Sequence, residues 1–183
     1  MDIKIDITGE HINTARLLLR PWEESDIHDF YDYASVPGVG EMAGWPHHDN
    51  IDISRQVLRS FIDGKNVFAI VYKENGRVIG SLGLHPLRDE VESELKALRI
   101  KELGYALSKD YWGMGLMPEA VKAVILFCFE NYKLDAIAVS HFVQNEQSKR
   151  VIQKCGFKYV GSDKRFAKQL NKEFDELNYI LYR

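Results

Sequence analysis

The sequence predicts an α+β fold built on a mixed sheet, and three observations indicate it. Short apolar or alternating runs typical of strands dominate the first half of the chain, at 16–20, 66–73 and 78–84. Strand-like and helix-like segments then alternate between 102 and 155. The chain closes on two long strand-like stretches within 157–183, which is typical of a β-hairpin.

Length and composition are those of a globular protein. The 183 residues suit a single domain spanning 1–183, in which residues 1–13 form a short leading strand or a loose arm. A hydrophobic content of 45% and a charged content of 28% are ordinary for a soluble protein. A net charge of −3 gives no general attraction to nucleic acid. No apolar run approaches the roughly 18 residues that a membrane span needs, so we expect neither nucleic acid nor membrane as a partner.

Two further features predict a cytoplasmic location. The two cysteines, Cys128 and Cys155, are isolated and lie in helix-like segments, which is typical of reduced core thiols. The start of the chain, Met1 to Asp6, alternates in character and lacks the apolar run of a signal peptide.

Local patterns predict the elements of the first half. The pair Asn75–Gly76 indicates the tight turn of a hairpin. The segment 36–50 is rich in Pro, Gly and His without periodicity, so we predict a loop there. The remaining expected elements are a strand at 16–20, helices at 26–33 and 53–63, and strands at 66–73 and 78–84.

The second half begins with a charged insertion. The run Asp89 to Glu94 would repel itself as a strand, so residues 85–100 are expected to form a solvated excursion with a partial helix. The expected elements that follow are a strand at 102–107, a helix at 119–132, a strand at 136–140, a helix at 146–155 and two strands joined around 170–172.

Two glycines with one residue between them, Gly113 and Gly115, connect a predicted strand to a predicted helix. Such a loop directs backbone N–H groups at an anion, and the helix dipole favours negative charge there. No Lys-Ser or Lys-Thr follows the second glycine, which excludes a Walker A loop, and Pro118 occupies the place of a third glycine in a dinucleotide fingerprint. By itself the loop is either a phosphate site or a tight connection.

A second motif, Asn145 to Phe157, contains a short helix closed by Gly156. Together the two segments resemble the Gcn5-related N-acetyltransferase (GNAT) superfamily, which has two such glycines followed about thirty residues later by Asn and then Lys-x-Gly-Phe. The segments 14–21, 78–84 and 103–105 look like strands of its RimJ/RimL-like branch, which acetylates ribosomal-protein N-termini. The resemblance covers roughly residues 14–183.

The resemblance implies a mixed, mostly antiparallel sheet flanked by helices, and acetyl-CoA as cosubstrate. The pantetheine arm would lie between the strands 102–107 and 136–140, which splay apart in the family. The pyrophosphate would lie on backbone amides of the glycine loop. The implied cofactor-binding residues are Leu107, Trp112, Gly113, Met114, Gly115, Leu116, Asn145 and Ser148.

Two of these residues have more than one interpretation. Asn145 either contacts the cofactor arm or caps the helix 146–155. Many family members place a tyrosine as general acid where this chain has Ile152, so that tyrosine is absent. The RimL-like branch places a serine at Ser148, which therefore either hydrogen bonds the CoA sulfur or lies on the helix surface.

The general base follows less directly. The branch places a glutamate where this chain has Ala167, so that carboxylate is absent. Glu102 matches a strand position used as base by other members of the superfamily, where burial raises the pKa of a carboxylate. The alternatives are an ordinary strand-end carboxylate at Glu102, a proton relayed through water, and direct attack by the fraction of amine that is neutral.

The predicted acceptor wall is the segment 45–52 together with His85, and its candidate substrate residues are Trp45, His48 and His85. The alternative for 45–52 is an ordinary polar loop. Adjacent histidines point their rings apart and no spaced third ligand stands out, so we expect no metal site.

The predicted activity is acetyl transfer from acetyl-CoA to a primary amine, with a protein N-terminus as the acceptor that the branch implies. Small amines such as polyamines, aminoglycosides or amino acids remain alternatives. A second class of function, a CoA-binding sensor without turnover, is favoured by the absent tyrosine and glutamate. Dimers are common in the family, so a homodimer is a possible assembly.

Overall fold

The computed structural model describes residues 3–88, 95 and 97–183. The expected excursion and partial helix around Asp89–Glu94 lie outside the described residues. Among the described residues, no helix is both long enough and apolar enough to cross a bilayer.

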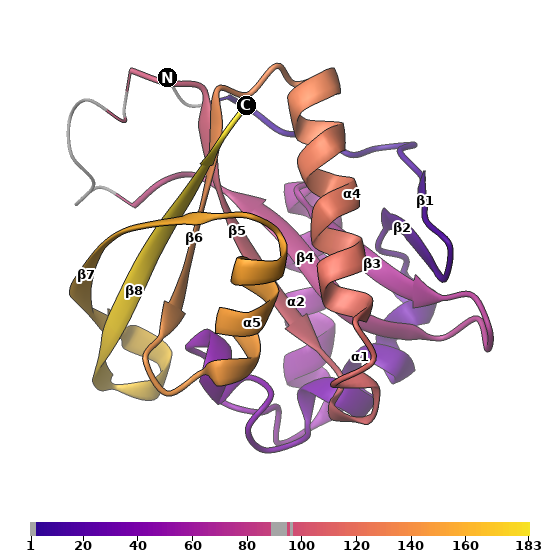
Figure 1. The fold of residues 1–183 in the computed structure, drawn as a ribbon. Helices are drawn as coiled ribbons and strands as arrows, with labels where there is room; N and C mark the ends of the chain where they lie inside the picture. Colours follow the sequence, from indigo (N-terminus) through magenta and orange to yellow (C-terminus); the bar gives the residue numbers. More distant parts are fainter. Residues whose placement is uncertain (1–2, 89–94, 96) are drawn as a thin grey trace.

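The strands form one sheet of eight, in the order β1-β2-β3-β4-β5-β6-β8-β7 (Figure 1). Every neighbouring pair is antiparallel except β5 and β6, which run parallel. This confirms the predicted α+β class with a mixed, mostly antiparallel sheet. The strands are β1 Ile12–Asn13, β2 Leu17–Pro21, β3 Val67–Tyr72, β4 Val78–His85, β5 Ile100–Leu107, β6 Ala136–Phe142, β7 Lys158–Ala167 and β8 Lys172–Tyr182.

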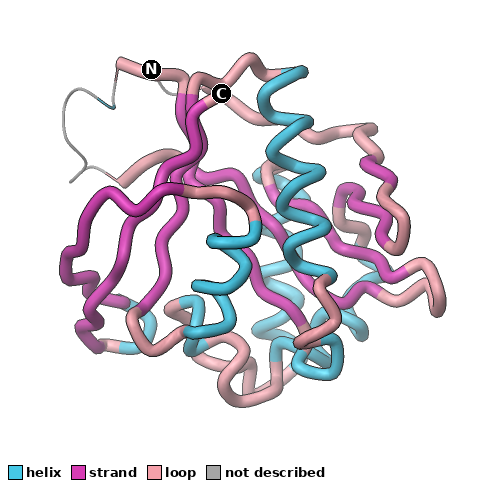
Figure 2. Tube along the Cα trace, viewed as in Figure 1, coloured by secondary structure: helices cyan, strands magenta, loops and turns pink. Residues whose placement is uncertain are grey.

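Helices cover both faces of the sheet (Figures 1 and 2). Helices α4 (Leu116–Asn131) and α5 (Glu146–Lys154) lie on one face, and α1 (Ile27–Ala34) and α2 (Ile51–Gly64) lie on the other. The predicted loop 36–50 contains only a short 3-10 turn, Glu41–Ala43.

The core follows from strand alternation. On the α4 face, Leu82, Leu103 and Ile137 are buried with Val121 and Val124 of α4. On the other face, a second buried cluster joins β3 and β4 to α1 and α2. All six residues of β3 are buried because helices cover both of its faces, which explains why its sequence is continuously apolar.

Several boundaries differ from the predicted ones. Helix α4 begins at Leu116, three residues before the predicted start, because Gly115 at φ +74° ends the preceding loop. Pro118 fits inside the first turn, where its missing N–H has no partner to lose. Strand β5 begins two residues early, at Ile100, and β6 runs on to Phe142. Residues 3–11 are not a strand, although Ile5 and Ile7 are buried in the core.

Strands β5 and β6 pair over only part of their length. The register runs from Ile100↔Ala136 to Leu103↔Val139 and then stops. Beyond that point β5 stays paired with β4 as far as Leu107, and β6 stays paired with β8 as far as Phe142. The two strands therefore diverge toward their C-terminal ends (Figure 1).

Glu119, in the first turn of α4, joins this helix to the start of β2. Its carboxylate accepts hydrogen bonds from Thr14 Oγ1 at 2.6 Å, from Arg16 N at 2.9 Å and from Arg16 Nε at 2.8 Å. Arg16 Nη1 also donates to Met114 O at 2.9 Å. One ion pair thus holds the glycine loop and the helix that follows it against the sheet.

We predict that Glu119→Ala lowers the free energy of unfolding by about 1–3 kcal/mol, because it leaves several partly buried donors without an acceptor. Chemical denaturation measures this. Glu130→Ala, at an exposed position near the end of the same helix, is the matched control and should change stability little. Equal losses of stability in the two variants would show that the contacts of Glu119 with Thr14 and Arg16 contribute nothing specific to stability.

Candidate active site

The gap between β5 and β6 opens into a cavity of about 610 Å³. Its walls come from β4, β5 and β6, from the loop 36–50, from the glycine loop and from the first turns of α4 and α5. Since β5 and β6 are parallel, the N-termini of the two helices that follow them lie at the same end of the gap. Both helix dipoles favour negative charge there.

The glycine loop has the geometry of a phosphate cradle. Gly113 and Gly115 have φ values of +79° and +74°, a region in which other residues are strained. A Cβ atom at Gly113 would meet no atom within 4 Å, so the space above this residue is open. The first backbone N–H groups of α4 have no partner within the helix. Residues of this kind fit a pyrophosphate.

Four predicted cofactor residues, Leu107, Trp112, Met114 and Leu116, lie in or beside this loop. The Leu116 side chain is buried in the core, whereas the Met114 side chain is exposed. The Trp112 indole donates from Nε1 to Leu107 O at 2.8 Å, which fixes the loop against the end of β5. The Leu107 carbonyl therefore already has a donor, and its N–H is the group left for a ligand.

The backbone groups that face the gap follow from strand phase. Ser108 N donates to Ile79 O, so the even-numbered residues of β5 bond β4, and Tyr105 and Leu107 face the gap. Arg183 N donates to Asp135 O, so by the same alternation Ser140 of β6 faces the gap. These are the exposed strand edges that an extended arm pairs with.

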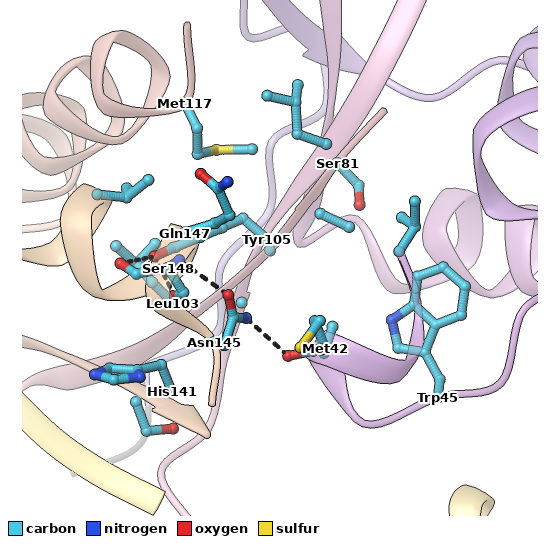
Figure 3. Close-up of a pocket in the computed structure, with 18 of the residues that line it drawn as sticks. Met42, Trp45, Ser81, Leu103, Tyr105, Met117, His141, Asn145, Gln147 and Ser148 are labelled. Atoms are coloured by element: carbon cyan, nitrogen blue, oxygen red, sulfur yellow. Dashed lines mark hydrogen bonds between the residues drawn. The ribbon is translucent and has the colours of Figure 1, made fainter. Parts of the chain in front are cut away.

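Asn145 and Ser148 lie at the start of α5, on the α4 side of the gap (Figure 3). Asn145 Oδ1 accepts from Ser148 N at 3.0 Å, which is the helix-cap alternative for this residue. Its Nδ2 donates to Met42 O at 3.0 Å. Ser148 is buried rather than on the surface, and its Oγ lies 2.8 Å from the Tyr105 hydroxyl.

Glu102 lies on the opposite face of the sheet, in a cluster of charges. Ser140 Oγ lies 3.2 Å from Glu102 Oε1 and 2.8 Å from Glu176 Oε1. The Arg88 guanidinium contacts both carboxylates, with Nε 3.4 Å from Glu102 and Nη1 2.6 Å from Glu176. Arg165 Nη1 lies 3.2 Å from Glu176, which is only 1% exposed.

The pKa of Glu102 is raised above its ordinary value. Burial is the main cause, and the charge of Glu176 acts in the same direction, whereas Arg88 and Arg165 lower the pKa of Glu102. A carboxylate with a raised pKa is, once ionised, a stronger base than an exposed one. Glu102 therefore has the electrostatic environment of a general base.

The loop 36–50, or wall loop, contains residues 45–50 of the segment predicted for the acceptor wall, and the last two residues of that segment begin α2. Trp45 packs on Gly40, where a Cβ atom would lie 2.2 Å from the ring. His48 lies between the rings of Phe30 and Trp45, and its Nδ1 is 2.7 Å from Ser54 Oγ. Its pKa is lowered, chiefly by burial. His48 is thus a neutral, packed part of the wall.

His85 is the last residue of β4, and its ring lies against Gly83 and Gly104. A Cβ atom at Gly83 would lie 2.4 Å from its Nε2, and one at Gly104 would lie 3.4 Å away. His85 is directly opposite Glu102 in the sheet register, so both side chains leave the same face. Burial within the cavity lowers the pKa of His85, and the charges of Lys101 and Arg165 lower it further.

Glu41 holds the wall loop together. Its carboxylate accepts from Gly38 N at 2.6 Å and from His47 N at 3.1 Å, and it lies 2.7 Å from His47 Nδ1. Burial opposes ionisation, but these hydrogen bonds outweigh it and lower the pKa of Glu41 to about 2. Within the described ranges, no group of three or more His, Cys, Asp or Glu side chains is arranged to hold a metal ion.

Similarity to known proteins shows which family this chain belongs to. A family model described as "Acetyltransferase (GNAT) domain" matches residues 16–158. The chain belongs to the GNAT family. It is therefore an N-acetyltransferase, and GNAT enzymes use acetyl-CoA as acetyl donor.

Two proteins are similar to this chain along nearly its whole length. An uncharacterized GNAT relative, the N-acetyltransferase p20 of Bacillus licheniformis, is 25% identical over 179 residues, covering 95% of this chain and 97% of its own. A GNAT acetyltransferase structure from Bacillus anthracis is similar with a TM-score of 0.81 at 23% identity, covering 94% of this chain and 98% of that chain.

Two further GNAT structures have informative descriptions. A ribosomal-protein-S5-alanine acetyltransferase from Vibrio fischeri has a TM-score of 0.72 at 19% identity, covering 94% of this chain and 96% of that one. The microcin C7 self-immunity acetyltransferase MccE, solved with acetyl-CoA and AMP, has a TM-score of 0.75 at 18% identity, covering 93% of this chain and 94% of that one. At these identities both show a shared GNAT fold.

The structure brings the predicted site residues to one cavity, from four separate stretches of the chain, although Met114 is not among its lining residues. Those that line it are Trp45, His48, His85, Glu102, Leu107, Trp112, Gly113, Gly115, Leu116, Asn145 and Ser148. Sequence reasoning missed the cluster of Arg88, Ser140, Arg165 and Glu176, which join from four distant segments. It also did not single out Tyr105, whose hydroxyl meets Ser148 Oγ.

We predict that Glu41→Gln destabilises the protein by about 1 kcal/mol at pH 7, a figure reduced for a carboxylate that is about one-third exposed. The folded-state pKa of about 2 lies below the ordinary value of 4.5 for a glutamate. The stabilisation is therefore complete above about pH 4.5 and is lost as the pH falls toward 2.

Thermal unfolding of wild type and Glu41→Gln between pH 2 and 7, with roughly one-unit steps, measures this difference. Glu24→Gln, at an exposed position in another 3-10 turn, is the control. A difference between wild type and Glu41→Gln that does not depend on pH would contradict the assignment.

Proposed function

We propose that the protein transfers the acetyl group of acetyl-CoA to a primary amine bound in the cavity, with Glu102 as general base and Ser148 as hydrogen-bond donor to the sulfur. One observation carries the proposal. The gap between β5 and β6 separates a partly buried carboxylate on one face of the sheet, 14% exposed, from a buried hydroxyl on the other, and it ends at the glycine loop.

The cosubstrate would lie along this gap. The pyrophosphate fits the open space at Gly113, on the N–H groups of the loop and of the first turn of α4. The pantetheine arm would pair with the gap-facing backbone of Tyr105, Leu107 and Ser140. We assign Asn145 an indirect role, because its side chain caps α5 and thereby orients Ser148.

The chemistry divides between the two faces. An amine acceptor arrives as an ammonium ion, and Glu102 accepts one of its protons. The neutral nitrogen attacks the thioester carbonyl, and gap-facing backbone N–H groups are the donors available to the oxyanion. When the C–S bond breaks, the sulfur leaves as a thiolate that accepts a hydrogen bond from the Ser148 hydroxyl, and the nitrogen loses its second proton to water.

The acceptor that we propose is a protein N-terminus. The resemblance of 14–21, 78–84 and 103–105 to the RimJ/RimL-like branch supports this choice. So does the shared fold with the Vibrio fischeri enzyme that acetylates an alanine of a ribosomal protein. Small amines remain the second candidate, since Ala167 replaces the glutamate of the branch and lies buried on β7.

We further propose that residues 1–183 form one acetyltransferase domain that works in the cytoplasm, with neither nucleic acid nor a membrane as partner. One sheet runs through the whole chain, and both cysteines are buried free thiols. A homodimer stays a prediction. A CoA sensor without turnover is the alternative, and the partly buried, base-like Glu102 favours the enzyme over it.

We predict that Gly113→Val weakens acetyl-CoA binding by about tenfold or more, because the new side chain fills the phosphate space and displaces charge-assisted hydrogen bonds. Isothermal titration calorimetry measures this affinity. Gly76→Val is the matched control, because Gly76 has φ +72°, equally open surroundings and a place in the distant β3–β4 turn. If the two variants bind acetyl-CoA equally well, the loop is not the phosphate site.

The second prediction concerns turnover. In a thiol-release assay with pooled acceptors, Glu102→Gln should lower kcat by about a hundredfold. The pool holds peptides with free Ser or Ala N-termini, polyamines and aminoglycosides. In the wild type, kcat/KM should rise with pH through the raised pKa of Glu102, because the base must be ionised, and this rise should be absent from the variant.

Glu173→Gln, an exposed carboxylate on β8, controls for a general change of charge. Splitting the pool then names the acceptor class. If wild-type protein binds acetyl-CoA but releases no thiol with any acceptor in the pool, the sensor alternative gains. If Glu102→Gln retains wild-type turnover, Glu102 is not the base.

A further inference from the structure

Two hydroxyl groups meet between β5 and α5, at the edge of the cavity. The Tyr105 hydroxyl lies 2.8 Å from Ser148 Oγ and 3.4 Å from Ser148 O (Figure 3). Both residues line the cavity, and Ser148 is 8% exposed. The contact joins residues 43 positions apart, so it arises only from the packing of α5 on the diverging end of β5.

Each hydroxyl carries one hydrogen, and the direction of the hydrogen bond between the two decides where the serine hydrogen points. If Ser148 donates to Tyr105, its only hydrogen is used up within the protein. If Tyr105 donates to Ser148 Oγ, the serine hydrogen is free to point into the cavity. A phenol is a much stronger hydrogen-bond acid than an alkyl alcohol, as its reference pKa of about 10 indicates.

The serine has little freedom to choose another arrangement. Ser148 N is held by Asn145 Oδ1, and Asn145 is in turn held through Met42 O in the wall loop. Tyr105 lies on the part of β5 that pairs with β4, from Glu102 to Leu107. Burial raises the pKa of Tyr105 well above its ordinary value, so the phenol keeps its proton across the working pH range.

We propose that Tyr105 is a positioning residue that donates its hydrogen bond to Ser148 Oγ and thereby commits the Ser148 hydrogen to the sulfur of CoA. This inference rests on the proposed role of Ser148. No proton is transferred in the step: the C–S bond breaks, its electron pair stays on sulfur, and the thiolate accepts the Ser148 hydrogen bond. The thiolate takes a proton from water when CoA leaves.

The test uses CoA, the product, as probe and needs no acceptor. The thiol of protein-bound CoA is titrated through the ultraviolet absorbance of its thiolate, and desulfo-CoA complexes supply the baseline for tyrosine ionisation. A donor aimed at the sulfur stabilises the thiolate. The pKa of the bound thiol should therefore lie about one unit lower in wild type than in Tyr105→Phe.

Three variants make the result specific. Ser148→Ala should raise the pKa of the bound thiol by as much as Tyr105→Phe does or more, and the double variant should equal Ser148→Ala alone, because Tyr105 acts through the serine. Tyr179→Phe removes another buried phenol on the same face, which contacts His141, and should leave the thiol unchanged. CoA affinity below the thiol pKa should be unchanged in Tyr105→Phe.

The outcomes distinguish the role of Tyr105 from the role of Ser148. A thiol pKa in Tyr105→Phe equal to that of wild type, with a clear shift in Ser148→Ala, overturns the role of Tyr105 and leaves that of Ser148. Additive shifts in the double variant overturn it as well, because they mean that Tyr105 acts on the thiol directly. If wild-type protein binds no CoA, or if Ser148→Ala has no effect, the proposed role of Ser148 falls and this inference falls with it.

Discussion

The early end of one strand pairing is the constraint on which the rest of the site depends. After Leu103 and Val139, β5 and β6 cease to bond each other, while each keeps its partner on the other side. Unpaired strand edges inside a protein need a substitute partner. The gap therefore provides both the space for an extended ligand and the backbone groups that bind it. The parallel direction of these two strands also brings two helix N-termini to the same end of the gap.

The sheet separates the chemical tasks by face. The side chains at odd-numbered positions of β5, which are Leu103, Tyr105 and Leu107, point toward α4 and α5. Glu102 is at an even-numbered position, so its side chain points toward the wall loop. Glu102 is partly buried among balanced charges, since Arg88 and Arg165 neutralise Glu176. A buried carboxylate without such partners would lower stability by several kcal/mol. The arginines thus allow two acids to lie close together beside an apolar wall.

Local signals in the sequence were enough for the elements and for the glycine loop. Alternation predicted the strands, Asn75–Gly76 predicted a turn, and Gly113 and Gly115 predicted the loop between a strand and a helix. The start of α4 was placed too late because Pro118 resembles a boundary and fits inside the first turn. Asn145 could not be decided from sequence, because a cap and a ligand contact need the same residue type at the same position.

The cluster around Glu176 could not be predicted from local patterns. Arg88 and Glu176 are 88 positions apart, and each by itself reads as a charge beside a strand. Their contact depends on how β8 is inserted between β6 and β7, which is a property of the whole topology. The same applies to Tyr105, whose ring fits the pattern of a core residue and whose hydroxyl gains a partner only when α5 packs against β5.

The hydrogen bond from Asn145 to Met42 O has a consequence for ligand binding. It connects the loop that lines one half of the cavity to the helix that lines the other half. The Nδ2 atom of Asn145 donates to the loop, and its Oδ1 atom accepts from Ser148 N at the start of the helix. An acceptor that moves the loop must therefore also disturb the first turn of α5. Thermodynamic linkage then requires the effect to be reciprocal, so that the affinities for donor and acceptor are coupled by the same factor in both directions.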